Sequence, residues 1–164
     1  MISLRPVNLD DLPLLKDLIY EFAEFERERD LVEITEDDLR RDGFGAEPRF
    51  RALMAECDGE VAGYAIFFPV FSTWEGRAAL FLEDLYVRPR FRGKGIGKAV
   101  LEHLAGIAKQ EGCFGMKWEV LDWNQPAIDF YHSIGAELQA DRRVLLFKGE
   151  VFERMAGARE RKRA

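Results

Sequence analysis

The sequence is poor in the residues that build metal centres and disulfide frameworks, and it has no long hydrophobic run. Its 164 residues include two cysteines, Cys57 and Cys113, and two histidines, His103 and His132. Their spacing fits neither a zinc site nor a C-x-x-C motif, so we expect reduced thiols and no metal. No apolar run approaches the ~18 residues that a membrane-spanning helix needs. The first residues lack a signal-peptide pattern, which predicts a cytoplasmic protein without a membrane partner.

Acidic residues outnumber basic ones, and they do so unevenly along the chain. The sequence contains 30 Asp and Glu against 24 Lys and Arg, a net charge of −6. Residues 1–42 hold 13 acids and 6 bases, whereas the remaining residues are close to balance. An acidic first third argues against a nucleic-acid partner and permits a small cationic one. Most of these acids are nevertheless expected on solvated helix faces.

A glycine-rich basic turn stands between an expected strand and an expected helix. Residues Arg88–Lys98 read R-P-R-F-R-G-K-G-I-G-K, after the apolar run Leu80–Val87 and before an amphipathic segment at 99–108. Glycine permits positive φ and close approach of a ligand, and the free N–H groups at a helix N-terminus attract anions. Neither the P-loop pattern nor G-x-G-x-x-G is present. We expect a phosphate site here; the alternative is a turn that only joins the strand to the helix.

Apolar periodicity and turn signals predict the element order β-α-α-β-β-β-α-β-α-β-β. The expected strands are Ile2–Arg5, Phe50–Glu56, Val61–Val70, Ala78–Val87, Phe114–Leu121, Glu137–Gln139 and Val144–Lys148. The expected helices follow Asn8 or Asp10, Thr35, the glycine turn and Asn124 as N-terminal caps.

This order predicts an α/β (α+β) fold: a mixed, largely antiparallel sheet of six or seven strands with helices on both faces. The strands that flank the helix after the glycine turn should be parallel, because a crossover joins them. No repeat or linker divides the chain. We expect one domain over residues 1–155, followed by a basic tail at 156–164.

The sequence resembles the GNAT superfamily of N-acetyltransferases. The R-x-x-G-x-G pattern at Arg92–Gly97 resembles the superfamily's acetyl-CoA pyrophosphate loop, and the resemblance extends from Leu4 to about Met155. Four stretches are closer to diamine (spermidine/spermine-type) and thialysine N-acetyltransferases. These are residues 23–26, 42–45, 82–87 and 123–131, of which W-N-x-P-A-I-x-F-Y in the last is the most specific. The resemblance therefore implies the GNAT fold.

The resemblance also implies acetyl-CoA as the co-substrate, a small-molecule amine as the acceptor, and a homodimer. Backbone groups of Leu85, Tyr86 and Val87, together with Asn124, would hold the pantetheine arm. The implied pyrophosphate loop consists of Arg92, Gly93, Lys94, Gly95, Ile96 and Gly97. Tyr131 would be the general acid that protonates the departing thiolate. The implied acceptor residues are Phe25, where the family has Tyr, with Glu26, Glu83 and Asp84.

Two of these implied roles have alternatives. Glu83 would bind the acceptor ammonium or accept its proton, directly or through water; the alternative is a carboxylate paired with an arginine. Because Glu83 and Asp84 are neighbours in a strand, both can reach one pocket only if the strand has a bulge there. For Tyr131 the alternative is an aromatic residue that packs on the sheet.

Three functions fit the sequence. The first is acetyl-CoA-dependent acetylation of a primary amine on a small cationic acceptor, a diamine, polyamine or lysine-like molecule, by direct transfer. The second is the same chemistry on a protein N-terminus, a lysine side chain or an amino acid. The third is a CoA-binding module without catalysis. Tyr131 and Glu83 argue against the third, because binding alone needs only the phosphate loop.

Overall fold

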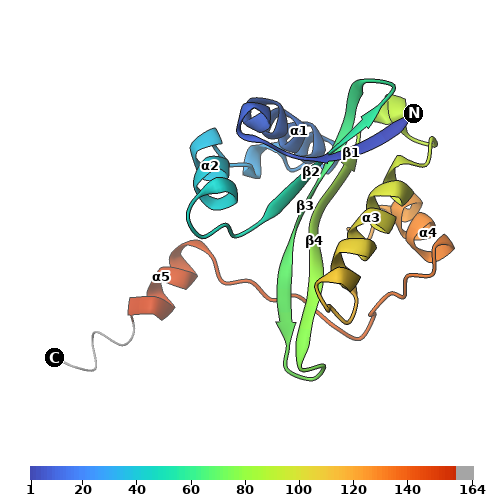
Figure 1. Cartoon of the computed structure of the whole chain (residues 1–164). Coiled ribbons are helices and arrows are strands. Elements are labelled where there is room, and N and C mark those ends of the chain that lie inside the picture. Colours follow the sequence, from blue (N-terminus) through green and yellow to red (C-terminus); the bar gives the residue numbers. More distant parts are fainter. Residues whose placement is uncertain (158–164) are drawn as a thin grey trace. The chain divides into compact units, whose positions relative to one another are not determined.

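Five strands form one mixed sheet in the computed structural model of this protein, which describes residues 1–157 (Figure 1). The strands are β1 Ile2–Pro6, β2 Arg51–Cys57, β3 Glu60–Ser72, β4 Arg77–Val87 and β5 Met116–Trp118. They are hydrogen-bonded in the order β1-β2-β3-β4-β5. The first four pair antiparallel, and β5 runs parallel to β4. The predicted parallel pair around the crossover helix is therefore confirmed.

Local signals explain where these elements begin and turn. The β2–β3 hairpin turns at Asp58 and Gly59, both with positive φ, as an Asp-Gly hairpin turn requires. Asn8 caps the short 3₁₀ turn η1 (Leu9–Asp11) that leads into helix α1 (Leu12–Phe25). Thr35 and Asp38 form a capping box at the start of helix α2 (Glu36–Phe44). The predicted first two helices are thus confirmed.

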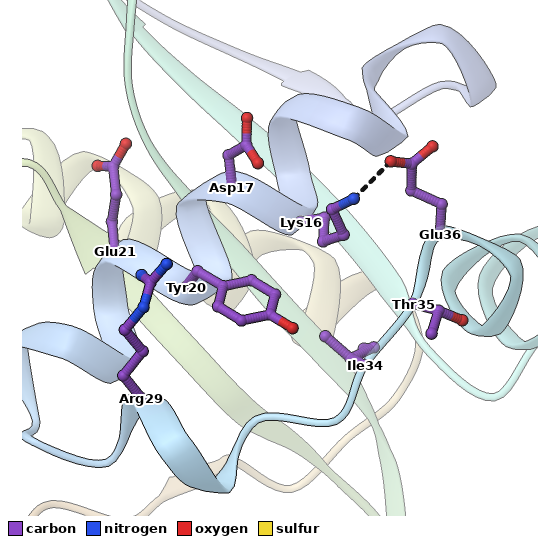
Figure 2. A pocket seen from close by; sticks show the side chains of 8 residues that line it. All are labelled: Lys16, Asp17, Tyr20, Glu21, Arg29, Ile34, Thr35 and Glu36. Carbon is purple, nitrogen blue, oxygen red and sulfur yellow. Dashed lines mark hydrogen bonds and ion pairs between the residues drawn. The ribbon is translucent and has the colours of Figure 1, made fainter.

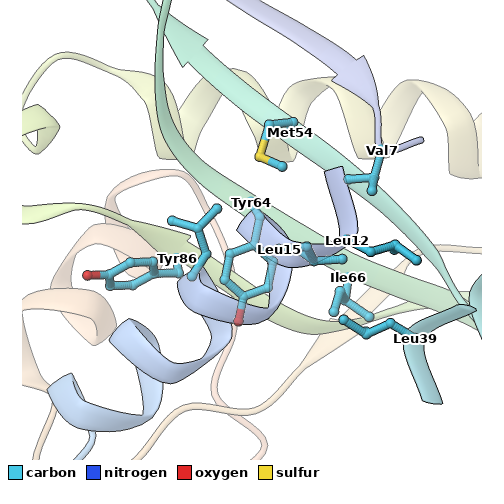
Figure 3. Packing of buried hydrophobic residues seen from close by; sticks show 9 residues of the cluster. Val7, Leu12, Leu15, Leu39, Met54, Tyr64, Ile66 and Tyr86 are labelled. Atoms are coloured by element: carbon cyan, nitrogen blue, oxygen red, sulfur yellow. The ribbon is translucent and has the colours of Figure 1, made fainter. Parts of the chain in front are cut away.

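One face of the sheet packs against α1 and α2. Figure 3 shows this core, in which leucines of the two helices meet Met54, Tyr64, Ile66 and Tyr86 of the strands. The opposite face is covered by α3 (Ile96–Gln110), which buries Ile96, Val100, Leu101, Leu104 and Ala108. Figure 1 shows α1 and α2 on one side of the sheet and α3 on the other. Burial on both faces explains why β3 is apolar almost throughout.

The described residues fall into two compact units, one from Met1 to Glu119 and one that begins at Val120. The first contains the sheet and helices α1–α3. The second contains α4 (Gln125–Ser133) and α5 (Gly149–Gly157). None of the described helices has the length and apolar character needed to cross a membrane. That the two units constitute a single domain over residues 1–155 stays a prediction.

The closing strands predicted at Glu137–Gln139 and Val144–Lys148 are wrong. Both segments lack regular structure, and the sheet has five strands instead of six or seven. The apolar run at 144–147 looked like a strand, but a strand needs a paired neighbour, and none of the described strands pairs with it.

Two other boundaries differ from expectation. The strand predicted at Phe114–Leu121 is shorter, Met116–Trp118, and helix α5 follows where none was expected. Its apolar residues Val151, Phe152 and Met155 have helical spacing, a signal that the strand interpretation of the preceding run obscured. Residues 158–164 of the predicted basic tail lie outside the described part of the chain.

Candidate active site

The two adjacent carboxylates of β4 reach the same cavity because the strand has a bulge at Glu83. Ile66 of β3 stands opposite Asp84, and the next residue, Phe67, stands opposite Leu82. Glu83 is therefore the extra residue in the ladder, which lets consecutive side chains turn toward one side. Both Glu83 and Asp84 line a cavity of about 560 Å³. The bulge that the sequence required for a shared pocket is confirmed.

This cavity lies over the α1–α2 face of the sheet and combines apolar walls with a few charged groups. Its lining residues are Ile19, Val32, Glu33, Ile34, Leu39, Arg49, Phe50, Ile66, Phe68, Glu83 and Asp84. An apolar cavity of this size with few convergent charges is typical of a small-molecule site. Three of the four charged residues are acids, which favours a cationic ligand.

Asp84 is held in place by a buried tyrosine. The Tyr64 hydroxyl donates a hydrogen bond to Asp84 Oδ2 at 3.0 Å, and the Tyr64 side chain is completely buried. Burial raises the pKa of Asp84 to about 6; the Tyr64 hydrogen bond opposes this effect, and the nearby Glu83 charge adds to it. The carboxyl group is therefore oriented, and its charged form is poorly stabilised by the protein itself.

The carboxyl groups of Glu26 and Glu83 also have raised pKa values. Burial, followed by repulsion from Glu28 and Asp84, raises the pKa of Glu26 to about 7. The pKa of Glu83 is also raised, by the protein that partly surrounds its carboxyl group and then by Glu119. Each of these acids would gain from a positive charge placed among them, because a nearby cation favours the ionised form. Three of the four predicted acceptor residues, Glu26, Glu83 and Asp84, therefore lie close enough for their charges to interact.

The glycine turn has the predicted geometry at the start of α3. Gly95 is the N-terminal cap of α3 in the left-handed conformation, with φ 84°, and Gly93 has φ 74°. A Cβ added at either glycine would meet no atom within 4 Å, so open space lies in front of the turn. Backbone N–H groups at such a helix start can bind a phosphate.

Of the five bases around the turn, three are engaged in ion pairs. Arg88 binds Glu21 through Nε and Nη2 at 2.8 and 2.6 Å. Arg90 binds Glu60 at 2.8 Å, and Lys98 lies 3.7 Å from Glu102. Arg92 and Lys94 are exposed, and they are the bases best suited to meet a phosphate.

Arg92 connects the turn to two other predicted site residues. Its Nε donates to the Val87 carbonyl at 2.9 Å, and its guanidinium lies 4.4 Å from the centre of the Phe25 ring. Residues Leu85–Val87 pair with β3, while the pairing of β4 with β5 ends at Leu82. The part of β4 that is predicted to hold the pantetheine arm, residues 85–87, therefore lies beyond the end of the β4–β5 pairing.

Asn124 and Tyr131 belong to the second unit. Asn124 is the N-terminal cap of α4, and its side chain accepts a hydrogen bond from the Ala127 N–H at 3.4 Å. The Tyr131 ring lies 5.4 Å from that of Phe130, centre to centre. Their roles at the thioester stay predictions.

Three residues near the acids escaped the sequence reasoning: Tyr64, Glu33 and Arg49. Tyr64 looked like one more apolar residue of a buried strand, although a buried phenol needs a partner for its hydroxyl, and that signal was present. Glu33 and Arg49 lie in loops, and only the fold brings them to the cavity of Asp84. No local pattern marks them.

A second cavity lies between α1, the 3₁₀ turn η2 (Arg29–Leu31) and the start of α2 (Figure 2). It is more polar, and its charges are largely satisfied. Lys16 binds Glu36 at 2.7 Å, and Arg29 lies 3.5 Å from Glu24 and over the Tyr20 ring. None of the predicted site residues is among its described lining.

Comparison with known proteins identifies the family of this chain. The model of the Acetyltransferase (GNAT) family matches residues 13–136. A thialysine N-epsilon-acetyltransferase of Bos taurus is 37% identical over 95% of this chain and 98% of its own length. A human spermidine/spermine N(1)-acetyltransferase-like protein 1 is 37% identical over 82% of this chain and 20% of its own length. An integron cassette protein of V. cholerae has a similar structure, with a TM-score of 0.79 and 26% identity over 96% of this chain and 98% of that one. The chain therefore belongs to the GNAT family of acetyltransferases and is an N-acetyltransferase.

Proposed function

We propose that this enzyme transfers the acetyl group of acetyl-CoA directly to a primary amine of a small cationic acceptor, a diamine, polyamine or lysine-like molecule. The observation that carries the proposal is the bulge of β4, which turns Glu83 and Asp84 into one apolar-walled cavity. The names of the relatives, thialysine and spermidine/spermine acetyltransferases, support an amine acceptor. The same arrangement gives little reason to expect a neutral or anionic acceptor.

The electrostatics of the cavity favour an ammonium group. Burial, and then the Glu83 charge, raise the pKa of Asp84 in the cavity lining to about 6. Glu26 is outside the described lining, and burial, followed by Glu28 and Asp84, raises its pKa to about 7. A nearby ammonium favours the ionised form of both carboxyl groups and so offsets the cost of their charges, which contributes to its binding free energy. An acceptor with a charged amine is therefore preferred over an uncharged one.

Acetyl transfer requires the bound ammonium to lose a proton before its nitrogen attacks the thioester. Glu83 is the proposed acceptor of this proton, directly or through water, since it is open to solvent and its raised pKa makes it a better base. Tyr131 is the proposed donor to the departing thiolate. A phenol is neutral at pH 7, with an ordinary pKa of about 10, so it carries a proton that it can donate to the sulfur as the C–S bond breaks.

The donor side of the proposal rests on the turn before α3. Acetyl-CoA supplies the thioester, and its pyrophosphate would be held by N–H groups of residues 93–97 with Arg92 and Lys94. The open space in front of Gly93 and Gly95 supports this fit. Residues 85–87 of β4, which lie beyond the end of its pairing with β5, would hold the pantetheine arm, together with Asn124. We also propose a homodimer, on the resemblance to the family, and size-exclusion chromatography with light scattering tests it.

An acceptor screen tests the function directly. Purified enzyme is incubated with acetyl-CoA and a panel of diamines, polyamines, lysine analogues, neutral amines and peptides, and free thiol is measured. We expect the cationic small molecules to be the best acceptors. Initial rates at varied concentrations of both substrates should give intersecting lines, because direct transfer passes through a ternary complex.

The variant Glu83→Gln tests the carboxylate. We expect a higher KM for the cationic acceptor and a kcat lower by about 10²-fold or more if proton transfer is lost. Glu75→Gln, an exposed residue in the β3–β4 turn, makes the same charge change and is the matched control. A best acceptor that is neutral, anionic or a protein N-terminus would reject the proposal, as would unchanged kinetic constants in Glu83→Gln.

A further inference from the structure

Two of the five bases around the glycine turn lie over aromatic rings and form no ion pair with a described residue. The guanidinium of Arg92 lies 4.4 Å from the centre of the Phe25 ring, and Lys94 Nζ lies 5.2 Å from the centre of the Phe91 ring. The other three bases have carboxylate partners. The ring under Arg92 belongs to α1, far from the turn in sequence, so only the fold brings the two residues together.

The kind of partner decides how much positive charge a base can offer to a ligand. A carboxylate cancels the charge of the base that it binds. A ring attracts a cation through its quadrupole and adds no negative charge. A base over a ring is therefore oriented and keeps its full charge, which is the combination that a phosphate-binding base needs.

Arg92 also keeps hydrogen-bond donors available. Its Nε donates to the Val87 carbonyl at 2.9 Å, and its terminal nitrogens donate to no described residue. A guanidinium has five N–H groups in one plane, so four of them remain for a ligand. Stacking uses the face of this plane and hydrogen bonds use its edge, so the Phe25 ring and a phosphate do not compete for the guanidinium. Arg92 is exposed, and a ligand can reach it.

The end of α1 fixes the position of Phe25, the last residue of the helix. The Glu28 N–H donates to the Ala23 carbonyl at 2.8 Å and the Arg27 N–H to the Glu24 carbonyl at 3.1 Å, the two bonds of a Schellman motif. The left-handed residue of this motif is usually glycine, but here it is Arg27, with φ 64°. Such strain persists only where the surrounding structure maintains it.

The Phe25 side chain is supported by the core as well. It is partly buried and packs against the cluster that contains Tyr64 and Tyr86. A ring held by the core and by the helix end provides a fixed surface, and the long side chain of Arg92 rests on it. The guanidinium is therefore ordered before a ligand arrives.

We propose that Phe25 is a positioning residue for the acetyl donor: its ring holds the Arg92 guanidinium in the orientation in which it binds a phosphate of acetyl-CoA. The resemblance to the family implied a role for Phe25 on the acceptor side, and its contact with Arg92 gives the ring a role at the donor site. The inference rests on the proposed function, because it takes acetyl-CoA as the donor. A tyrosine, which the family has at this position, would supply the same ring.

The test measures the Kd of acetyl-CoA by calorimetry in the absence of any amine. Phe25→Leu removes the ring and keeps an apolar side chain, so Arg92 has to be ordered when the phosphate binds. We expect the Kd to rise by about fivefold, the factor that corresponds to ordering one long side chain. Phe25→Tyr keeps the ring and should keep most of the affinity. If Phe25→Leu does not fold, Phe25→Met serves in its place.

A double-mutant cycle shows whether the effect passes through Arg92. Arg92→Gln alone should raise the Kd by about tenfold or more, because charge-assisted hydrogen bonds are lost. In that background Phe25→Leu should raise the Kd no further, since no guanidinium remains to be held.

A donor without phosphates gives a second measurement. S-acetylpantetheine has the same thioester as acetyl-CoA but cannot contact a phosphate site. With one cationic amine as the acceptor, the ratio of kcat/KM for acetyl-CoA to that for S-acetylpantetheine should fall by about fivefold in Phe25→Leu. A general loss of packing would lower both values and leave the ratio unchanged.

Phe22→Leu is the matched control. Phe22 lies one turn earlier on α1, and its ring lies 5.6 Å from that of Tyr86, with no described base over it. It should leave both the Kd and the ratio unchanged. The role of Phe25 is overturned by a wild-type Kd in Phe25→Leu, by an equal rise in Phe22→Leu, or by a further fivefold rise in the Arg92→Gln background.

Failure of this role and failure of the proposed function give different results. In each of the three cases above, the proposed function survives if wild-type enzyme binds acetyl-CoA and acetylates a cationic amine. If wild-type enzyme binds no acetyl-CoA, the proposed function and the role of Phe25 are both wrong.

Discussion

The hydrogen bond between Tyr64 and Asp84 should control the pH at which the enzyme begins to bind its amine. Tyr64 is completely buried, and its hydroxyl lies 3.0 Å from Asp84 Oδ2. Tyr64→Phe removes this donor and keeps the ring, so the packing against α1 should be retained. Asp84 then loses the one contact that counteracts burial and the Glu83 charge.

The expected size follows from the strength of such a bond. A hydrogen bond to a charged group contributes about 1.5–3 kcal/mol, and water in the cavity would replace part of it, so we take the lower value. One pKa unit corresponds to about 1.4 kcal/mol. The pKa of Asp84 should therefore rise from about 6 by about one unit. The acidic limb of the pH profile of kcat/KM should move upward by a similar amount.

The assay is kcat/KM for the best amine between pH 5 and pH 9, with acetyl-CoA at saturation. Glu26, Glu83 and Asp84 titrate as a coupled set, so the midpoint of the limb is compared between enzymes and not assigned to one residue. Tyr20→Phe, which removes a hydroxyl from the second cavity, is the matched control. A limb that stays in place in Tyr64→Phe, or that moves to lower pH, would refute the reasoning.

The pH dependence of stability gives an independent test of the pKa of Asp84. The folded pKa of Asp84, about 6, lies above its ordinary value of 3.8. Its contribution to the free energy of unfolding is therefore fully present below about pH 4 and is lost as the pH rises through about 6. In Tyr64→Phe this loss should extend to higher pH, and the difference in Tm from wild type should be larger at pH 8 than at pH 5.

Three further variants test other parts of the structure. Gly95→Glu places a charged side chain where φ is 84° and should abolish the thermal stabilisation by acetyl-CoA, whereas Gly95→Asn, which tolerates this φ, should retain more of it; equal affinities would contradict the phosphate site. Gly63→Ala puts a Cβ 2.0 Å from the Tyr86 carbonyl oxygen and should lower the free energy of unfolding by about 1–3 kcal/mol in urea titrations; an unchanged midpoint would mean that β3 and β4 are less tightly paired. Tyr131→Phe should keep the Kd of acetyl-CoA and lower kcat by about 10²–10⁴-fold; wild-type turnover would make it a packing residue.

The elements that the sequence predicted well are those with their own local signals. Thr35 with Asp38 marks a helix start, Asp58 with Gly59 marks a hairpin, and Gly95 marks the start of α3. Each signal acts through neighbouring residues, so it predicts the same local structure whatever the rest of the fold is. The bulge at Glu83 was also predictable, as the condition under which two adjacent acids share a pocket.

The features that escaped prediction depend on residues far apart in the chain. The run at 144–147 has the composition of a strand, yet whether it pairs depends on an edge that no local pattern reveals. Arg49, in the loop before β2, and Asp84 on β4 share a cavity only because the fold places β2 and β4 on either side of β3. Likewise, the resemblance singled out Glu26 as an acceptor residue, but no local pattern shows that burial raises its pKa to about 7.

The bulge at Glu83 could not be removed without disrupting the packing of β4. In a regular strand with Asp84 on the same face as Tyr86, Glu83 would point to the opposite face, which α3 covers with apolar side chains. Removing the extra residue would restore the ladder, but it would turn every side chain on one side of it to the other face. Tyr86 would then leave the core that it shares with Tyr64 and Phe22, or Leu80 and Leu82 would leave the α3 face. The insertion that brings two carboxylates into one cavity is therefore also what lets both halves of β4 remain buried, and neither can be changed without the other.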